Sequence, residues 1–213
     1  ATFRRIGSGY GESLAMASMC EVVARAGDVD ALGPLLDETI GLSRKLDNKH
    51  NLATIARLRG VIAASAGDTL SAKAHGEEAL SIFRDIGDRH CAVETLANLS
   101  EAALAEGDAD RAYALVTEGL ATANRIGLKR HLARCLERVA DVAIAWNRED
   151  RAAELLGAAE ALRERIGGPA PALDVGALER MRAQVGGHVD SWRLGREEPS
   201  GNAVATAMTL TKG

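Results

Sequence analysis

The sequence of 213 residues is long enough to bury the core of one domain. Hydrophobic residues make up 46% of it and aromatic residues only 3%, with Ala and Leu dominant, a balance that favours helices over a β-sandwich or barrel. With 26 basic and 30 acidic residues the formal charge is −4, so no net field attracts nucleic acid or an anionic membrane.

A repeat of 40 residues organises most of the chain. Its first marker is a Gly-Asp pair, replaced by Asn-Arg in the last copy, at Gly27-Asp28, Gly67-Asp68, Gly107-Asp108 and Asn147-Arg148. A second marker keeps the same interval, at Leu46-Asp47, Ile86-Gly87, Ile126-Gly127 and Ile166-Gly167. Gly and Asn tolerate the left-handed conformation in which helices end. The markers therefore predict an all-α chain of helix-turn-helix repeats.

Residues 1–8 look like the end of a repeat, because Phe3-Arg4-Arg5-Ile6-Gly7 is similar to Phe83-Arg84-Asp85-Ile86-Gly87, two periods further on. We therefore expect the chain to start in the tail of a truncated upstream repeat, with the array continuing in a longer parent protein. The run Gly7-Ser8-Gly9-Tyr10-Gly11 lacks the Lys and the preceding strand of a phosphate-binding loop. It is interpreted as a turn between helices.

Residues 9–167 are predicted to form four repeats, each a helix, a Gly-Asp turn, a second helix and an Ile-Gly stop. In the third repeat, Ala92, Leu96, Leu99 and Ala103 follow the spacing of one buried helical stripe. The predicted repeats span 9–47, 48–87, 88–127 and 128–167. Their helix pairs are 11–26 with 30–46, 50–66 with 70–86, 90–106 with 110–126, and 130–146 with 150–166. Because one hairpin cannot bury its apolar face alone, neighbouring hairpins are expected to stack into a solenoid.

The pattern ends before residues 168–213, which are predicted to form a C-terminal cap and tail. The run Gly167-Gly168-Pro169-Ala170-Pro171 interrupts the helical periodicity. The expected helices are a cap over 174–185 and a short final helix over 201–210. Ser200 is expected to be the N-cap of the final helix. Trp192 is interpreted as a packing anchor for the tail, with ligand stacking as the alternative.

Small residues recur at fixed distances from each turn. In the first helix one such position holds Cys20, Gly60, Ser100 and Ala140. In the second helix two positions hold Leu32, Ala72, Ala112 and Ala152, then Thr39, Ala79, Gly119 and Ala159. This pattern resembles the tetratricopeptide repeat family and implies an α-α superhelix. The period is 40 residues rather than 34, and the family's large aromatics are mostly absent; HEAT-like units are the minor alternative.

A second resemblance covers the end of the chain. Residues 151–171, together with Trp192-Arg193-Leu194-Gly195-Arg196, look like the carboxyl end of large bacterial signalling regulators. Those proteins join a nucleotide-binding switch ATPase to a helical repeat region, and some add a transcription-factor module of the LuxR or SARP type or a nucleotide cyclase domain. The resemblance implies that this chain is the sensor or docking arm of such a regulator.

No catalytic or metal site is predicted. His50 and His90 occupy the same slot of successive repeats, and His131 lies one place later. Equivalent slots on neighbouring helices are about 10 Å apart, whereas zinc needs nitrogen ligands at about 2.0–2.1 Å. We therefore interpret these histidines as polar helix starts and predict no metal and no cofactor. Because the HExxH motif, a Ser-His-Asp cue and a nucleophile elbow are absent, we expect no enzyme, with a hydrolase or transferase as a distant possibility.

Cysteine usage and hydropathy give an expected location. Cys20, Cys91 and Cys135 are odd in number and widely spaced, which argues against a closed disulfide framework. They are interpreted as small buried thiols in a reducing compartment. The sequence has no run of 18 apolar residues and no secretory leader. We therefore expect a cytoplasmic protein that does not bind membranes.

The candidate binding residues follow from the tetratricopeptide resemblance. In that family the first helices line a concave groove, and some members clamp a peptide's terminal carboxylate there with basic and Asn residues. The positions that match in this chain are Arg57, Asn98, Arg134 and Arg138, while Val61 replaces one further Asn. Arg can hold a carboxylate by two parallel hydrogen bonds. The alternative is a mixed charged surface in which the acidic residues of the same helices neutralise these arginines: Glu94, Glu101, Glu137 and Asp141.

These observations favour a non-catalytic domain that binds a protein or peptide partner or other domains of its parent chain. The alternative is a sensor domain that binds a small-molecule effector in the groove, which would require a pocket with convergent polar groups. Neither reading involves direct contact with nucleic acid.

Overall fold

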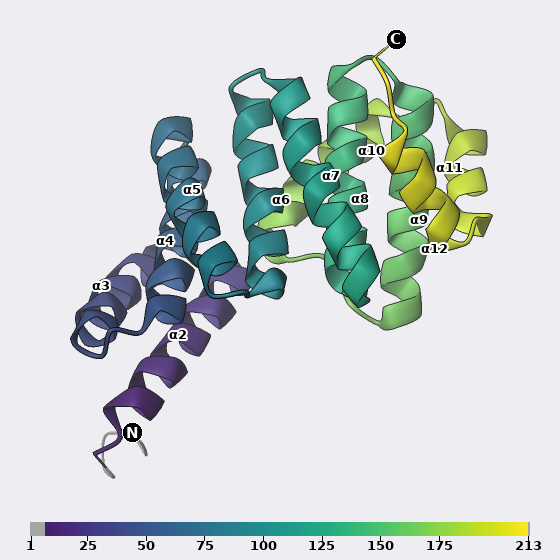
Figure 1. The fold of residues 1–213 in the computed structure, drawn as a ribbon. Coiled ribbons are helices and arrows are strands. Elements are labelled where there is room, and N and C mark those ends of the chain that lie inside the picture. The colour runs from purple at the N-terminus through teal and green to yellow at the C-terminus, as the bar shows by residue number, and fades with distance from the viewer. Residues whose placement is uncertain (1–6, 213) are drawn as a thin grey trace. The chain divides into compact units, whose positions relative to one another are not determined.

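The computed structural model describes residues 7–212, and these form eleven α-helices and no strand. The predicted all-α fold, with consecutive helices packed as hairpins, is confirmed (Figure 1). The similarity expected for residues 1–8 falls largely outside the described part of the chain. None of the helices in residues 7–212 is both long enough and apolar enough to cross a lipid bilayer.

The chain divides into two compact units, Ala1–Thr95 and Leu96–Gly213, and the boundary lies inside helix α6. Unit 1 contains four complete helices and the first part of a fifth: α2 (Gly9–Ala26), α3 (Val29–Lys45), α4 (Lys49–Ser65), α5 (Thr69–Asp85) and α6 (Arg89–Ala105). Helices α2 and α3 form one hairpin, and α4 and α5 form the next. Fully buried apolar side chains hold the first hairpin to α4, among them Cys20, Leu32, Leu36, Ile55 and Leu58.

The Gly-Asp turns work as their chemistry predicts. Gly27, Gly67 and Gly107 have φ of 78°, 76° and 81°, a left-handed conformation that costs glycine little and ends the first helix of each hairpin. The Asp that follows each glycine caps the second helix: Asp28 and Asp108 accept hydrogen bonds from the backbone N–H three residues on, at 3.1 and 3.0 Å. In each Gly-Asp marker, the glycine therefore ends one helix and the aspartate begins the next.

Unit 2 contains the rest of α6 and six further helices. They are α7 (Ala109–Ile126), α8 (Lys129–Ala145), α9 (Glu149–Ile166), α10 (Ala172–Gln184), α11 (Val189–Glu197) and α12 (Ser200–Met208). Helices α8 and α9 continue the hairpin pattern, and α10 lies against both of them. Leu136, Val139 and Leu155 are fully buried in the core of this unit.

The C-terminal tail differs from its prediction in two respects. Helix α11 was not expected, and it packs along α9 because two glycines let the backbones meet. A Cβ on Gly195 would lie 1.8 Å from the carbonyl oxygen of Glu154, and one on Gly157 would lie 2.1 Å from that of Trp192. Trp192 is half-buried, and the guanidinium of Arg196 lies 5.0 Å from the centre of its ring; whether it anchors the tail stays a prediction. Ser200 is the first residue of α12, and Pro199 is the N-cap.

Helix α12 returns to the hairpins of unit 2. The hydroxyl of Tyr113 on α7 donates a hydrogen bond of 2.9 Å to the carbonyl of Ala207 on α12. The Tyr113 ring packs against Trp146, with ring centroids 5.0 Å apart. The guanidinium of Arg148 donates to the carbonyl of Thr211 at 3.1 Å. The tail of unit 2 is therefore fixed by specific polar contacts.

Candidate functional site

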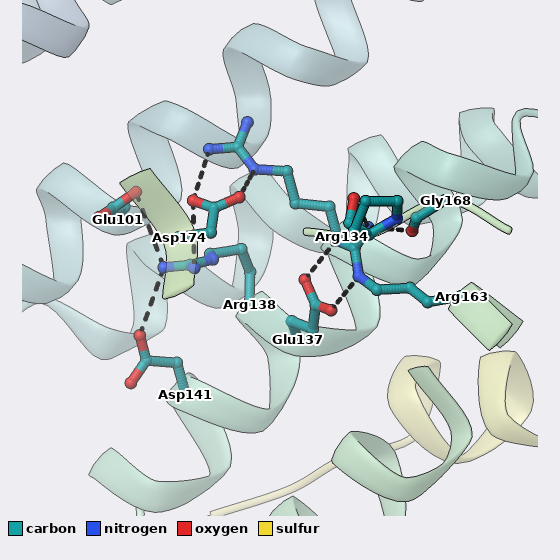
Figure 2. Close-up of polar contacts among 9 residues, drawn as sticks. Glu101, Arg134, Glu137, Arg138, Asp141, Arg163, Gly168 and Asp174 are labelled. Carbon is teal, nitrogen blue, oxygen red and sulfur yellow. Dashed lines mark hydrogen bonds and ion pairs between the residues drawn. The ribbon is translucent and has the colours of Figure 1, made fainter. Parts of the chain in front are cut away.

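Two of the predicted binding residues, Arg134 and Arg138, lie one turn apart on α8 and both face Asp174 on α10 (Figure 2). Arg134 donates from Nε and Nη2 to the two oxygens of Asp174, at 2.9 and 3.2 Å. Nη2 of Arg138 lies 3.6 Å from Oδ1 of the same carboxylate. Arg134 therefore holds a carboxylate by the two hydrogen bonds that the prediction required, with Arg138 as a second nearby cation, but the carboxylate belongs to this chain.

Arg138 is completely buried, with a relative exposure of 0%. Besides Asp174 it faces Glu101 and Asp141, with Nη1 3.6 and 3.7 Å from their nearest oxygens. None of its three side-chain nitrogens makes a hydrogen bond within the described structure. A buried cation in this position is stabilised by charge alone, and its desolvation is costly unless all the surrounding carboxylates remain.

The charges around Arg138 shift the pKa values of its two most buried carboxylic acids in opposite directions. Burial raises the pKa of Asp174, but Arg134 and then Arg138 outweigh burial, so the net pKa is below its ordinary value of 3.8. Burial also raises the pKa of Asp141, and here Arg138 does not fully offset it, so the net pKa is above 3.8. Asp174 is therefore the carboxylate that the arginine pair holds most firmly in its ionised form.

A second ion pair places the segment that leads into α10. Arg163 on α9 donates to both oxygens of Glu137 on α8, at 2.8 Å for the Nη2 contact. Its Nη1 also donates to the carbonyls of Gly168 and Pro169, at 3.3 Å each. The Gly-Pro break that the sequence marks is thus hydrogen-bonded to α9, shortly before α10 begins at Ala172.

A pocket of about 390 Å³ lies beside this ion pair, between α9 and α10. Its charged lining residues include Glu137, Glu160, Arg163, Glu164 and Arg182. Several of these are already paired within unit 2: Arg182 lies 3.4 Å from Glu160, and Arg196 holds Glu164 at 2.7 Å. Much of the charge in the pocket is therefore neutralised by its own walls, and apolar side chains such as Leu156, Val175 and Leu178 complete the lining.

Arg57, the third predicted residue, belongs to unit 1 and forms a separate cluster. It is 4% exposed, it donates to Glu21 on α2, and its Nη2 lies 3.5 Å from Glu94 at the start of α6. Burial lowers the pKa of Arg57, but Glu94 and Glu21 outweigh burial and raise it overall. The alternative interpretation, in which acidic neighbours neutralise the arginines, describes Arg57 well.

Asn98 lies on the part of α6 that belongs to unit 2. It is half-buried, and its Nδ2 is buried without a hydrogen-bond partner in the described structure. The four predicted residues therefore do not form one described centre: Arg134 and Arg138 share a carboxylate, Asn98 lies in the same unit, and Arg57 lies in the other.

A further polar cluster, which the sequence interpretation missed, joins α4 and α6 within unit 1. Nε2 of His50 lies 3.0 Å from Oδ2 of Asp88 and 4.0 Å from Sγ of Cys91. Nδ1 of His90 lies 3.8 Å from the same sulfur. The two histidines were expected to be too far apart to act together, yet both imidazoles contact one thiol, because helix spacing alone ignores the reach of side chains.

The three cysteines are free. Cys20 and Cys135 are buried as predicted, and burial raises the pKa of Cys135 to about 12. Cys91 is only half-buried, in contrast to the prediction. Burial and the neighbouring Asp88 raise its pKa to about 12, so in the protein alone this group is a thiol at neutral pH.

Comparison with protein-family models finds no match, and comparison with curated proteins finds none.

Proposed function

We propose that this chain is a non-catalytic protein-interaction domain whose arginine pair, Arg134 and Arg138, binds an acidic side chain of a partner segment. In this proposal α10 is a built-in occupant of that site. The observation that carries it is the two-pronged grip on Asp174, because it supplies the geometry that a carboxylate clamp needs.

The way α10 is held supports exchange with a partner. Besides Asp174, the helix buries Ala177, Leu178 and Met181, while Leu173 and Val175 remain substantially exposed. Burial of Leu178 and Met181 contributes about 4 kcal/mol, and a partner segment with two apolar residues of its own can match that. A helix of 13 residues also has little intrinsic stability once it is released.

The sequence resemblance suggests the kind of protein in which this interaction takes place. Because residues 151–171 look like the end of bacterial signalling regulators with tetratricopeptide-like repeats, we propose that the chain is the docking arm of such a multidomain regulator. The partner segment would then come from another protein or from other domains of the same regulator. Its defining chemistry is an Asp or Glu flanked by apolar residues.

The pocket between α9 and α10 favours one second candidate, a small-molecule effector site. A ligand there would contact Arg163 and so act on the start of α10. A thermal-shift screen of metabolites separates the two candidates. Stabilisation of unit 2 by one compound supports a sensor, and a flat screen together with peptide binding supports docking.

The direct test uses a fluorescent peptide with the sequence of residues 169–186, which contains α10 and its Asp. In full-length protein carrying Asp174→Asn, the resident helix loses its charge, so the arginine pair should bind the added peptide at least about 10-fold more tightly than in the wild type. Fluorescence anisotropy measures the affinity. A peptide with Asn in place of this Asp is the ligand control.

A matched protein control is Asp190→Asn, which changes a fully exposed aspartate in the first turn of α11. It should bind the peptide as the wild type does. Equal affinity of the Asp174→Asn protein for the Asp and Asn peptides would show that the arginine pair does not select carboxylates, and the proposal would fail.

A further inference from the structure

Three side chains with different metal-binding atoms converge where α4 and α6 begin. The ligand atoms of His50, Asp88 and Cys91 all lie within 4.8 Å of one another. His50 is the second residue of α4, Asp88 directly precedes α6, and Cys91 lies in the first turn of α6. All three belong to unit 1.

The spacing of these atoms suits a tetrahedral zinc ion. Two oxygen or nitrogen ligands at 2.0–2.2 Å from zinc lie about 3.4 Å from each other, and a sulfur ligand at about 2.3 Å lies slightly further away. The observed separations from Nε2 of His50 are 3.0 Å to Asp88 and 4.0 Å to Cys91, one shorter and one longer than this. Small side-chain rotations are enough to equalise them.

Two of the three ligands, Asp88 and His50, are already oriented by a second contact. Oδ1 of Asp88 accepts the backbone N–H of Cys91 at 3.0 Å, which caps α6 and leaves Oδ2 directed at His50. The ring of His50 packs edge-on against Phe83, with centroids 5.9 Å apart. Such outer contacts fix the direction of metal ligands and raise metal affinity. Helix capping therefore accounts for the position of Oδ1 of Asp88. It does not account for the position of His50 next to Oδ2.

We propose that His50, Asp88 and Cys91 bind one Zn²⁺ ion, with a solvent water as the fourth ligand. Nδ1 of His90 lies 3.8 Å from the sulfur of Cys91 but outside the group of mutually close ligand atoms, so His90 is an outer contact of this sulfur. A thiolate with an imidazole and a carboxylate is a donor set that suits zinc rather than magnesium or calcium, which prefer oxygen alone. On binding, the S–H bond of Cys91 breaks, a Zn–S bond forms and the proton passes to the solvent.

The ion would connect the starts of two successive first helices, α4 and α6, within unit 1. The three protein ligands come from the starts of both helices, and the role we assign to the ion is to join them. Zinc would stabilise the folded form of unit 1, because the unfolded chain does not hold these ligands together.

The test measures zinc binding to untagged full-length protein, since a polyhistidine tag would bind zinc itself. After chelator treatment and dialysis, competition with a chromophoric chelator should give one Zn²⁺ per chain. Cys91→Ser and His50→Ala should each weaken binding at least about 100-fold. His75→Ala is the matched control, because His75 is a partly exposed histidine of unit 1 outside the cluster; it should bind as the wild type does.

Cobalt gives a second readout that does not depend on the variants folding well. Co²⁺ added to the wild type should produce visible bands of a four-coordinate ion and a sulfur-to-cobalt charge-transfer band, and the latter should be missing in Cys91→Ser. Circular dichroism checks that each variant keeps its helices. Zinc affinity unchanged by Cys91→Ser, or a wild-type cobalt spectrum without the sulfur band, would overturn the proposal.

Discussion

Each unit of the molecule buries one arginine of a first helix, and the two arginines are satisfied in different ways. Arg57 in unit 1 donates directly to Glu21 on a neighbouring helix of the repeat. Arg138 in unit 2 faces three carboxylates at 3.6–3.7 Å without a hydrogen bond to any of them. One of the three, Asp174, comes from a helix outside the repeat pattern. The repeat can thus bury an arginine on a first helix, and in unit 2 the additional helix α10 supplies one of the carboxylates that this arginine faces.

The largest expected effect is a difference in unfolding free energy between the alanine variants of Arg138 and Arg57. Arg138→Ala leaves Asp174, whose side chain is 3% exposed, without one of its cations, and should cost about 4 kcal/mol of unfolding free energy. Arg57→Ala leaves Glu21 and Glu94, which are 25% and 15% exposed and can turn toward water; its cost should be about 2 kcal/mol. Equal losses would show that the burial of the acidic partners does not decide the outcome.

Urea denaturation can follow the two units separately. Both tryptophans, Trp146 and Trp192, lie in unit 2, so tryptophan fluorescence reports that unit, and hydrogen exchange of α2 to α5 peptides reports unit 1. Arg193→Ala is the control for an arginine whose side chain is largely exposed and faces only a fully exposed aspartate. It should leave both transitions in place.

The second-largest expected effect is the loss of stability caused by Asp174→Asn. Asp174→Asn should destabilise unit 2 by about 3 kcal/mol at neutral pH, because it leaves two arginines with less negative charge. The folded pKa of Asp174 is below its ordinary value of 3.8, so its contribution is complete above that value and is lost as pH falls through the folded pKa. The stability difference between the wild type and Asp174→Asn should therefore be constant near neutral pH and shrink below pH 3.8. A difference that grows in acid would contradict this assignment.

The smallest effect should be the same in both units. Asp28 in unit 1 and Asp108 in unit 2 cap their helices through equivalent hydrogen bonds. Asp28→Ala and Asp108→Ala should each cost about 1 kcal/mol, the first seen by hydrogen exchange in unit 1 and the second by tryptophan fluorescence. If one cap matters much more than the other, the repeats are not energetically alike.

The sequence predicted those features that depend on local chemistry. Helix ends at Gly67 or Gly107, and the caps that follow them, are set by a few neighbouring residues, so the period of 40 residues was enough to find the hairpins. It also pointed to Arg134 and Arg138, which the structure places on one carboxylate. Whether that pair binds a partner stays a prediction.

The features that escaped prediction depend on contacts between distant segments. No periodic signal marks Asp174 as the residue that α8 holds, since α10 lies outside the repeats. Helix α11 depends on two glycines, Gly157 and Gly195, that meet only in the folded chain. The grouping of His50 with Cys91 was missed because distances were judged between helix axes. A Cys directly after the His90 slot, with a capping Asp before it, was the available signal.

The covalent link between α10 and the arginine pair has a consequence for dose response. A tethered carboxylate competes at an effective concentration of roughly millimolar or more, and dilution of the protein does not change it. If the arginine pair binds a partner as proposed, an outside acidic segment would have to exceed a threshold affinity that does not depend on the amount of protein in the cell. The length and stiffness of residues 167–171 would set that threshold.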